Sequence, residues 1–238
     1  MVEGLQLAAK FVLPAYRNGS CGTGELPEKQ LVKCITEGNC KGVRNEFSKL
    51  ATMYPYLETI RTILGYSSPF HPDVVRAYWL GSDNLSKAEP KHFEQLLDNL
   101  VSQGFPEGQL DEVRKIAPST FVPTHLYPVL LSRLLGPGSL EDLSSVNDCM
   151  VRWGVINSIK EEKALVAPLS LVNENGNLKT GRIETDVGFD SKLLETELKE
   201  GDEVAIHLKW VSKKISPMES ISLLKWTLEV LRAYNNGG

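Results

Sequence analysis

The sequence predicts an α+β protein: a helical N-terminal half, a small antiparallel sheet or partial barrel, and a C-terminal capping helix. Apolar residues recur at helical spacing over 1–147, whereas between 148 and 211 they mostly alternate with a period of two. A capping box formed by Ser216 and Glu219, with a proline at the first helical position, then marks the start of the last helix. These three observations determine the fold class.

The chain divides into a helical region, 1–147, and a β region with its closing helix, 148–238, which we expect to form one integrated unit. The 238 residues carry a formal net charge of −4 and are 42% hydrophobic, which is typical of a globular protein. No run of basic residues is longer than two, as at Lys213 and Lys214, so we expect no binding to nucleic acid. The sequence does not indicate an oligomeric state.

The N-terminal segment places Glu3 and Lys10 within its apolar run, unlike a signal peptide. No stretch approaches the ~20 apolar residues that cross a bilayer. We therefore expect no membrane association and a cytoplasmic location. Because cytosolic thiols stay reduced, the four cysteines are expected to be free: Cys21, Cys34, Cys40 and Cys149.

Prolines and glycines set the expected helix boundaries. A first helix over 3–12 ends before Pro14. Pro55 interrupts the apolar stripe of 43–65, which predicts either two helices meeting near Tyr54 or one kinked helix. Further helices are expected over 27–37, 71–81, 89–104, 108–118 and 124–136.

The β region begins with an expected strand over 148–159, and others follow over 163–172 and 178–185. Pro168 indicates a bulge or an edge within the second of these. The pair Asn175-Gly176 suits a type I′ hairpin turn.

A last strand follows a turn at Gly201 and runs to Val211, and the side chains of Leu208 and Trp210 share its apolar face. The closing helix has two apolar stripes, so we expect it to pack between the helical region and the strands.

Cys21 lies in the stretch "NGSCGTGEL", where glycines on both sides would expose its sulfur. A nearby helix N-terminus over 27–37 would lower the pKa of such a thiol, although a small residue in a packed loop is the alternative. Cys34 and Cys149 lie on apolar faces and are interpreted as core residues, Cys149 on the strand face of Trp153.

The four histidines differ in their settings. His125 is the second residue of an apolar helix, where the dipole favours a neutral ring that serves as base, ligand or structural residue. His207 lies on the less apolar face of its strand, between layers if that face is covered and solvated otherwise. His71 is interpreted as an N-cap substitute, and His92 as a surface residue.

Familiar catalytic motifs are absent from the sequence. It has no phosphate-binding loop, dinucleotide fingerprint or H-E-x-x-H. It also lacks a C-x-x-C pair and a G-x-S-x-G elbow. Aromatic residues gather in the helical region, where they line a pocket or fill the core: Tyr54, Tyr56, Tyr78, Trp79 and Tyr127.

The stretches "FVLPAYRNGSCGTGE", "YPYLETI", "VVRAYWLG", "DCMVRWGVI" and "GDEVAIHLKWV" occur in an order that resembles an uncharacterised family of bacterial and archaeal proteins over almost the full chain. The resemblance implies no established activity, although some members are encoded beside nickel–iron hydrogenase genes. It points to seven positions, which are Cys21, Tyr78, Trp79, His125, Cys149, Arg152 and His207.

The chain departs from that family pattern at two places. Tyr127 and Pro128 stand where the pattern has a second histidine near His125, which weakens a two-histidine metal site there. Lys209 stands where the pattern favours Asp.

Two functions are carried forward. The first is a cytosolic accessory protein that binds a partner protein, in the assembly or maturation of a metalloenzyme such as a hydrogenase. The alternative is a thiol- or metal-dependent enzyme in which Cys21 acts with His125 or His207 as catalytic residues or as ligands of a transition metal. Tyr78, Trp79 and Arg152 are the candidate cofactor-binding residues. A third hypothesis, small-molecule binding, requires a pocket near Tyr78 and Trp79.

Overall fold

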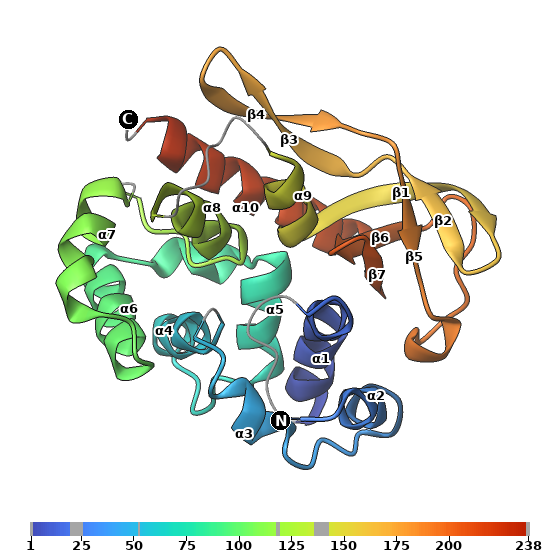
Figure 1. Cartoon of the computed structure of the whole chain (residues 1–238), viewed down its shortest axis with the longest axis horizontal. Coiled ribbons are helices and arrows are strands. Elements are labelled where there is room, and N and C mark those ends of the chain that lie inside the picture. Colours follow the sequence, from blue (N-terminus) through green and yellow to red (C-terminus); the bar gives the residue numbers. More distant parts are fainter. Residues whose placement is uncertain (1, 20–25, 52, 118–119, 136–142, 237–238) are drawn as a thin grey trace.

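The computed structural model describes residues 2–19, 26–51, 53–117, 120–135 and 143–236. Its helices gather on one side of the molecule and its strands on the other, which confirms the α+β class (Figure 1). The helices are α1 Val2–Arg17, α2 Glu28–Glu37, α3 Val43–Phe47, α4 Tyr54–Leu64, α5 Pro72–Leu80, α6 Pro90–Ser102, α7 Leu110–Ile116, α8 Leu126–Leu135, α9 Ser144–Cys149 and α10 Pro217–Asn235. The strands are β1 Arg152–Lys160, β2 Lys163–Val166, β3 Leu169–Glu174, β4 Asn177–Arg182, β5 Thr185–Gly188, β6 Glu203–His207 and β7 Trp210–Lys214.

Helix α1 is longer than the sequence predicts, because it continues through Pro14 to Arg17. The proline removes one backbone donor. Most of α1 is buried, however, and it packs against α2 and α5, so tertiary contacts outweigh the lost hydrogen bond. The expected end near Val12 is therefore wrong.

The region around Pro55 forms two separate helices, α3 and α4. This confirms the two-helix alternative. Pro55 lies in the first turn of α4, where a missing backbone N–H costs no intrahelical hydrogen bond. Gly65 ends the helix in the left-handed conformation, with a φ of 73°.

The strands form a closed five-stranded barrel in the order β1-β2-β5-β7-β6, together with the separate β3-β4 hairpin. Neighbouring barrel strands are antiparallel except β5 and β7, which pair in parallel between Gly188 and Trp210. Pro168 separates β2 from β3, because proline cannot donate to a ladder. In the hairpin turn, Asn175 and Gly176 both have positive φ, as a type I′ turn requires.

Several strand boundaries differ from the sequence prediction. The expected strand over 178–185 ends at Arg182 as β4, and Thr185 begins β5. Residues 148 and 149 belong to α9, and β1 begins only at Arg152. Asn147 holds this helix in place, because its side-chain amide exchanges two hydrogen bonds with the backbone of Leu171 in β3. The expected last strand is a hairpin instead, since Leu208 and Lys209 both adopt positive φ and turn the chain between β6 and β7.

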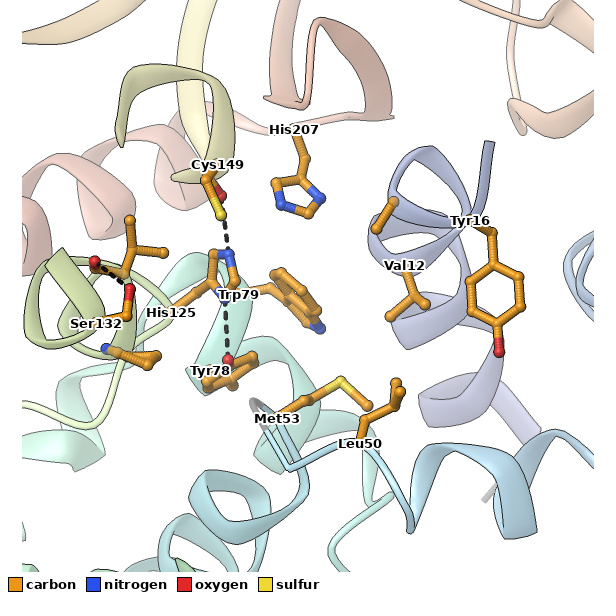
Figure 2. Close-up of a pocket in the computed structure, with 13 residues that line it drawn as sticks. Val12, Tyr16, Leu50, Met53, Tyr78, Trp79, His125, Ser132, Cys149 and His207 are labelled. Atoms are coloured by element: carbon orange, nitrogen blue, oxygen red, sulfur yellow. Dashed lines mark hydrogen bonds between the residues drawn. The ribbon is translucent and has the colours of Figure 1, made fainter. Parts of the chain in front are cut away.

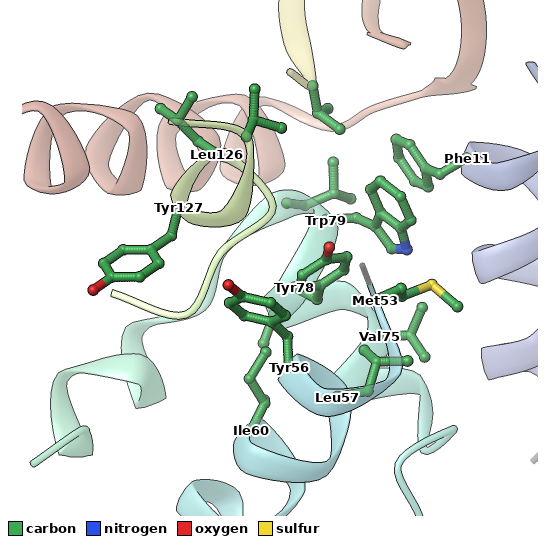
Figure 3. Close-up of a cluster of buried hydrophobic side chains, with 14 of the residues drawn as sticks. Phe11, Met53, Tyr56, Leu57, Ile60, Val75, Tyr78, Trp79, Leu126 and Tyr127 are labelled. Carbon is green, nitrogen blue, oxygen red and sulfur yellow. The ribbon is translucent and has the colours of Figure 1, made fainter. Parts of the chain in front are cut away.

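Helix α10 packs against α5 and α8 on one side and against β1, β4 and β6 on the other, as its two apolar stripes predict. A single cluster of buried apolar side chains extends from the helices to Ala205 and Ile215 of the β region. Figure 3 shows its aromatic centre, where Tyr56, Tyr78 and Trp79 lie together. A second, smaller core fills the barrel.

Two further expectations are wrong. Cys34 and Cys40 form a disulfide rather than free thiols. The left-handed Gly38 ends α2 and turns the chain back, which brings the two Cα atoms to 4.3 Å. His92 is buried rather than exposed, because its Nδ1 accepts a hydrogen bond from the Glu89 backbone at the start of α6. His71 caps α5 as expected.

Candidate functional site

A partly open pocket of about 150 Å³ lies where α1, α5, the start of α8, α9 and β6 meet (Figure 2). Its wall is mostly apolar, and the polar side chains His125, Cys149 and His207 lie at one end. The described residues that line it are Val12, Ala15, Tyr16, Leu50, Met53, Tyr78, Trp79, His125, Pro128, Val129, Ser132, Cys149 and His207.

Three chain segments far apart in sequence place these polar groups. His125 directly precedes α8, and its backbone N–H donates to the Tyr78 carbonyl of α5 at 2.8 Å. Cys149 is the last residue of α9. His207 ends β6, and the next backbone N–H, of Leu208, donates to the Asp148 carbonyl at 2.8 Å. The β6–β7 turn is therefore tied to α9, which sets His207 beside Cys149.

The hydrogen bonds of His125 define its neutral tautomer. Its Nε2 lies 2.9 Å from the backbone oxygen of Cys149, which only accepts, so Nε2 carries the proton. Its Nδ1, 2.9 Å from the Tyr78 hydroxyl, then accepts from that hydroxyl. Both ring nitrogens of His125 are thus engaged.

His207 has the opposite tautomer. Its Nδ1 lies 2.6 Å from the Phe11 backbone oxygen of α1, which fixes the proton on Nδ1. Its Nε2 is buried, carries a lone pair and makes no hydrogen bond. A histidine whose Nδ1–H is held by a backbone carbonyl and whose Nε2 is left available has the usual arrangement of a metal ligand.

Both imidazoles are neutral at physiological pH. Burial, helped by the proximity of His207, lowers the pKa of His125 to about 3, against an opposing effect of the Cys149 carbonyl. Burial likewise lowers the pKa of His207 to about 4, although the carbonyls of Phe11 and Cys149 favour the charged form. Since only a neutral imidazole donates its lone pair to a metal, no proton has to leave either ring.

Trp79 forms the aromatic wall beside the two imidazoles. Its ring centroid lies 4.4 Å from that of His125 and 5.5 Å from that of His207. The Trp79 ring also stacks on the ring of Phe11, with the two centroids 4.9 Å apart. This packing restricts the orientation of both histidine rings, because each has an aromatic face against it.

One donor atom from each of His125, Cys149 and His207 lies within 4.8 Å of the others. Cys149 is half-buried and is not part of a disulfide. A tetrahedral zinc ion, with bonds of about 2.0–2.1 Å to nitrogen and about 2.3 Å to sulfur, requires donors roughly 3.3–3.7 Å apart. Side-chain shifts of about 1 Å would close the three donors around an ion of that size.

The structure brings together only part of the site that the sequence predicts. His125 and His207 meet, and Tyr78 and Trp79 line the same pocket. Cys21, the expected nucleophile or third ligand, lies outside the described residues.

Arg152 lies outside the pocket. It is buried, its guanidinium donates to Ser170 at 3.0 Å, and it lies 3.8 Å from Asp148. Lys209 pairs with Asp148 at 3.1 Å.

Hydrophobic periodicity predicted the wrong secondary structure for Cys149. An alternating pattern suggested a strand whose inner face held Cys149, whereas it ends a short helix and lines the pocket. The resemblance to the uncharacterised family included this cysteine among its pattern positions, and that was the one available signal.

Comparison with known proteins gives one match. A family described as "Family of unknown function (DUF6390)" matches residues 1–237. No curated protein and no solved structure matches the chain. No helix in the described part combines the length and apolar character needed to cross a bilayer.

Proposed function

Since the chain belongs to DUF6390, a family of unknown function, we propose from the site alone that this protein binds a transition-metal ion through His125, Cys149 and His207. The observation that carries the proposal is the buried Nε2 of His207, a lone pair without a hydrogen bond, at a site where three donors converge. A buried polar atom without a partner costs free energy, and a bound cation would remove that cost.

The donor set favours a particular class of metal. Two imidazole nitrogens and one thiolate suit Zn²⁺, Cu or Ni²⁺, whereas Mg²⁺ and Ca²⁺ prefer oxygen ligands. Three protein ligands leave a fourth position of a tetrahedral ion for another molecule, as in catalytic rather than structural zinc sites. All three donor residues line the apolar pocket, which therefore offers space next to the cluster for such a molecule.

His125 has to change its tautomer to join the site. In the metal-free arrangement its Nε2–H donates to the Cys149 carbonyl. Moving the proton to Nδ1 frees Nε2, and the Tyr78 hydroxyl, which both donates and accepts, then accepts from Nδ1–H. The Tyr78 hydroxyl can therefore hydrogen-bond Nδ1 of His125 in either tautomer, with or without a bound ion.

Elemental analysis and metal titration of the purified protein test this proposal. We expect one zinc, nickel or copper ion per chain, and an at least tenfold weaker affinity in His207→Gln and in Cys149→Ser. His71→Gln, a change at a half-buried helix cap outside the pocket, is the matched control. Affinity that is unchanged in both ligand variants, or the absence of stoichiometric metal under all conditions, would contradict the proposal.

The accessory role in metalloenzyme assembly stays a second proposal, together with a cytoplasmic location and the association with nickel–iron hydrogenase. One observation favours a partner protein: α10 exposes three large apolar side chains, Met218, Ile221 and Leu228, which are 74%, 60% and 42% accessible. The three side chains recur at helical spacing on one face of α10, and exposed apolar patches of more than a few hundred Å² mark protein–protein contact sites.

A nickel-transfer assay tests the accessory role. The nickel-loaded protein should transfer its ion to a metal-free nickel–iron hydrogenase subunit faster than free nickel at the same concentration. Ile221→Asp should slow that transfer without changing nickel affinity, whereas Lys29→Asp, at an exposed position of α2, should change transfer less. Equal rates for all three proteins would rule out docking through this face.

A further inference from the structure

The pocket contains a second buried polar atom that the proposed metal ion does not use. Trp79 is only 3% exposed, and its Nε1–H makes no hydrogen bond. Figures 2 and 3 show this nitrogen on the edge of the indole that faces Met53, which lines the pocket. A buried donor without a partner is rare in native proteins and therefore requires an explanation.

The size and lining of the pocket limit what can enter. About 150 Å³ corresponds to a cavity that accommodates a molecule the size of a benzene ring. The lining includes aliphatic side chains from several elements, among them Val12, Leu50 and Val129. Burying such a molecule removes its apolar surface from water, which supplies most of the binding free energy.

Charge restricts the ligand further. None of the described lining residues is Asp, Glu, Lys or Arg. Burying an unpaired charge in such an apolar site is strongly unfavourable. The apolar part of the site therefore selects a neutral molecule.

We propose that this pocket binds a neutral, single-ring-sized apolar molecule whose one hydrogen-bond acceptor, such as a carbonyl oxygen, accepts from Trp79 Nε1–H. This deepens the proposed function and rests on it for the role of the ligand, since the molecule occupies the space beside the metal ion. Its binding does not require the ion, because the aliphatic wall and the Trp79 donor belong to the protein alone.

Three probes that share a six-membered carbon ring test the ligand class: cyclohexanone, its near-isostere methylenecyclohexane, and the anion cyclohexanecarboxylate. Ligand-observed NMR titrations are run on the full chain, once with a chelator and once with Zn²⁺. Cyclohexanone should bind, with an affinity about fivefold above that of methylenecyclohexane, as the gain of one net hydrogen bond implies. Cyclohexanecarboxylate should bind at least tenfold more weakly than the ketone in the presence of chelator.

Variants locate the site. Trp79→Phe keeps the aromatic wall but removes the N–H, so it should weaken cyclohexanone binding about fivefold and leave methylenecyclohexane unchanged. Trp226→Phe is the matched control, because Trp226 Nε1 is also buried without a partner but lies outside the pocket. Ala15→Leu fills the pocket from α1 and should weaken all binding at least tenfold.

The outcomes separate the two proposals. Ketone binding with chelator, in a protein that takes up no metal, would remove the proposed metal function and keep the ligand site. Metal uptake without any ketone binding would keep the proposed metal function and remove the ligand site. Equal affinity for the ketone and the carboxylate with chelator, or ketone affinity unchanged in both Trp79→Phe and Ala15→Leu, would overturn the ligand proposal. Circular dichroism of each variant establishes that it folds.

Discussion

The rings of His125 and His207 meet edge to face, with centroids 5.1 Å apart and planes at 90°. They come from segments 82 positions apart in the sequence (207 − 125), one before α8 and one at the end of β6. Each ring has one nitrogen committed to a backbone carbonyl, of Cys149 for His125 and of Phe11 for His207. The pair therefore connects the helical region to the β region at the pocket, so protonation of either ring should affect the stability of both regions.

Acid should destabilise the metal-free protein through these two rings. Their pKa values are about 3 and about 4 in the folded chain, whereas an unfolded histidine titrates near 6.5. Between those limits the unfolded chain binds more protons, so the contribution to stability is complete above about pH 6.5 and falls as pH decreases. At pH 5 the loss is about 2 kcal/mol for each ring.

Urea unfolding in the presence of a chelator, at pH 7 and at pH 5, measures this effect. His207→Gln should reduce the difference between the two pH values, and so should His125→Gln, whereas the His71→Gln control should retain it. A wild-type free energy of unfolding that is equal at both pH values would show that these rings are not buried in neutral form.

Removing the Tyr78 hydroxyl tests the hydrogen bond to His125. In Tyr78→Phe the Nδ1 acceptor of His125 loses its donor at a buried position, so the free energy of unfolding should fall by about 1–2 kcal/mol. Metal affinity should fall as well, because no hydroxyl remains to accept from Nδ1–H in the metal-bound tautomer. Tyr16→Phe is a suitable comparison, since its hydroxyl contacts Glu46 at the pocket rim without touching either imidazole. Stability and metal affinity equal to those of the wild type would contradict the tautomer assignment.

Gly4 marks the closest approach between α1 and the loop before α5. A Cβ atom there would lie 2.1 Å from the Phe70 backbone oxygen, which cannot move aside as a flexible side chain would. Gly4→Ala should therefore cost about 1–3 kcal/mol in thermal or urea unfolding. Gly108→Ala is the control, because no atom lies within 4 Å of its added Cβ and its φ is not positive. Similar effects of the two changes would argue against this helix packing.

The Cys34–Cys40 disulfide should contribute to stability only under oxidising conditions. A loop this short restricts the unfolded chain by about 2 kcal/mol, so a reductant should lower the free energy of unfolding by about that amount. In Cys34→Ala the reductant should have no such effect, whereas Cys149→Ala should respond like the wild type. Alkylation of Cys34 in unfolded protein that has never been reduced would disprove the disulfide.

Local sequence signals predicted much of the fold. Helical spacing, the Ser216–Glu219 capping box and the Asn175-Gly176 turn depend on neighbouring residues, and each is confirmed. Errors arose where distant contacts decide the outcome. Pro14 lies inside α1 because the helix is buried, and Leu208 and Lys209 form a turn without glycine.

The candidate site was less accessible to sequence reasoning. Proximity of His125 and His207 depends on the packing of α8 against α9 and on the hydrogen bond from Leu208 to Asp148 that ties the β6–β7 turn to α9, which no local pattern encodes. The reactive-cysteine hypothesis relied on the glycines around Cys21, which lies outside the described residues. Cys149 was assigned to a strand because a short helix followed directly by a strand mimics an extended alternation.

X-ray absorption at the edge of the bound metal tests the central claim most directly. For the loaded wild-type protein we predict one sulfur neighbour at about 2.3 Å together with imidazole nitrogens at about 2.0–2.1 Å, with the sulfur contribution lost in Cys149→Ser and the imidazole contribution reduced in His207→Gln. A coordination shell that contains only oxygen and nitrogen in the wild type, unchanged in both variants, would contradict a metal centre at His125, Cys149 and His207.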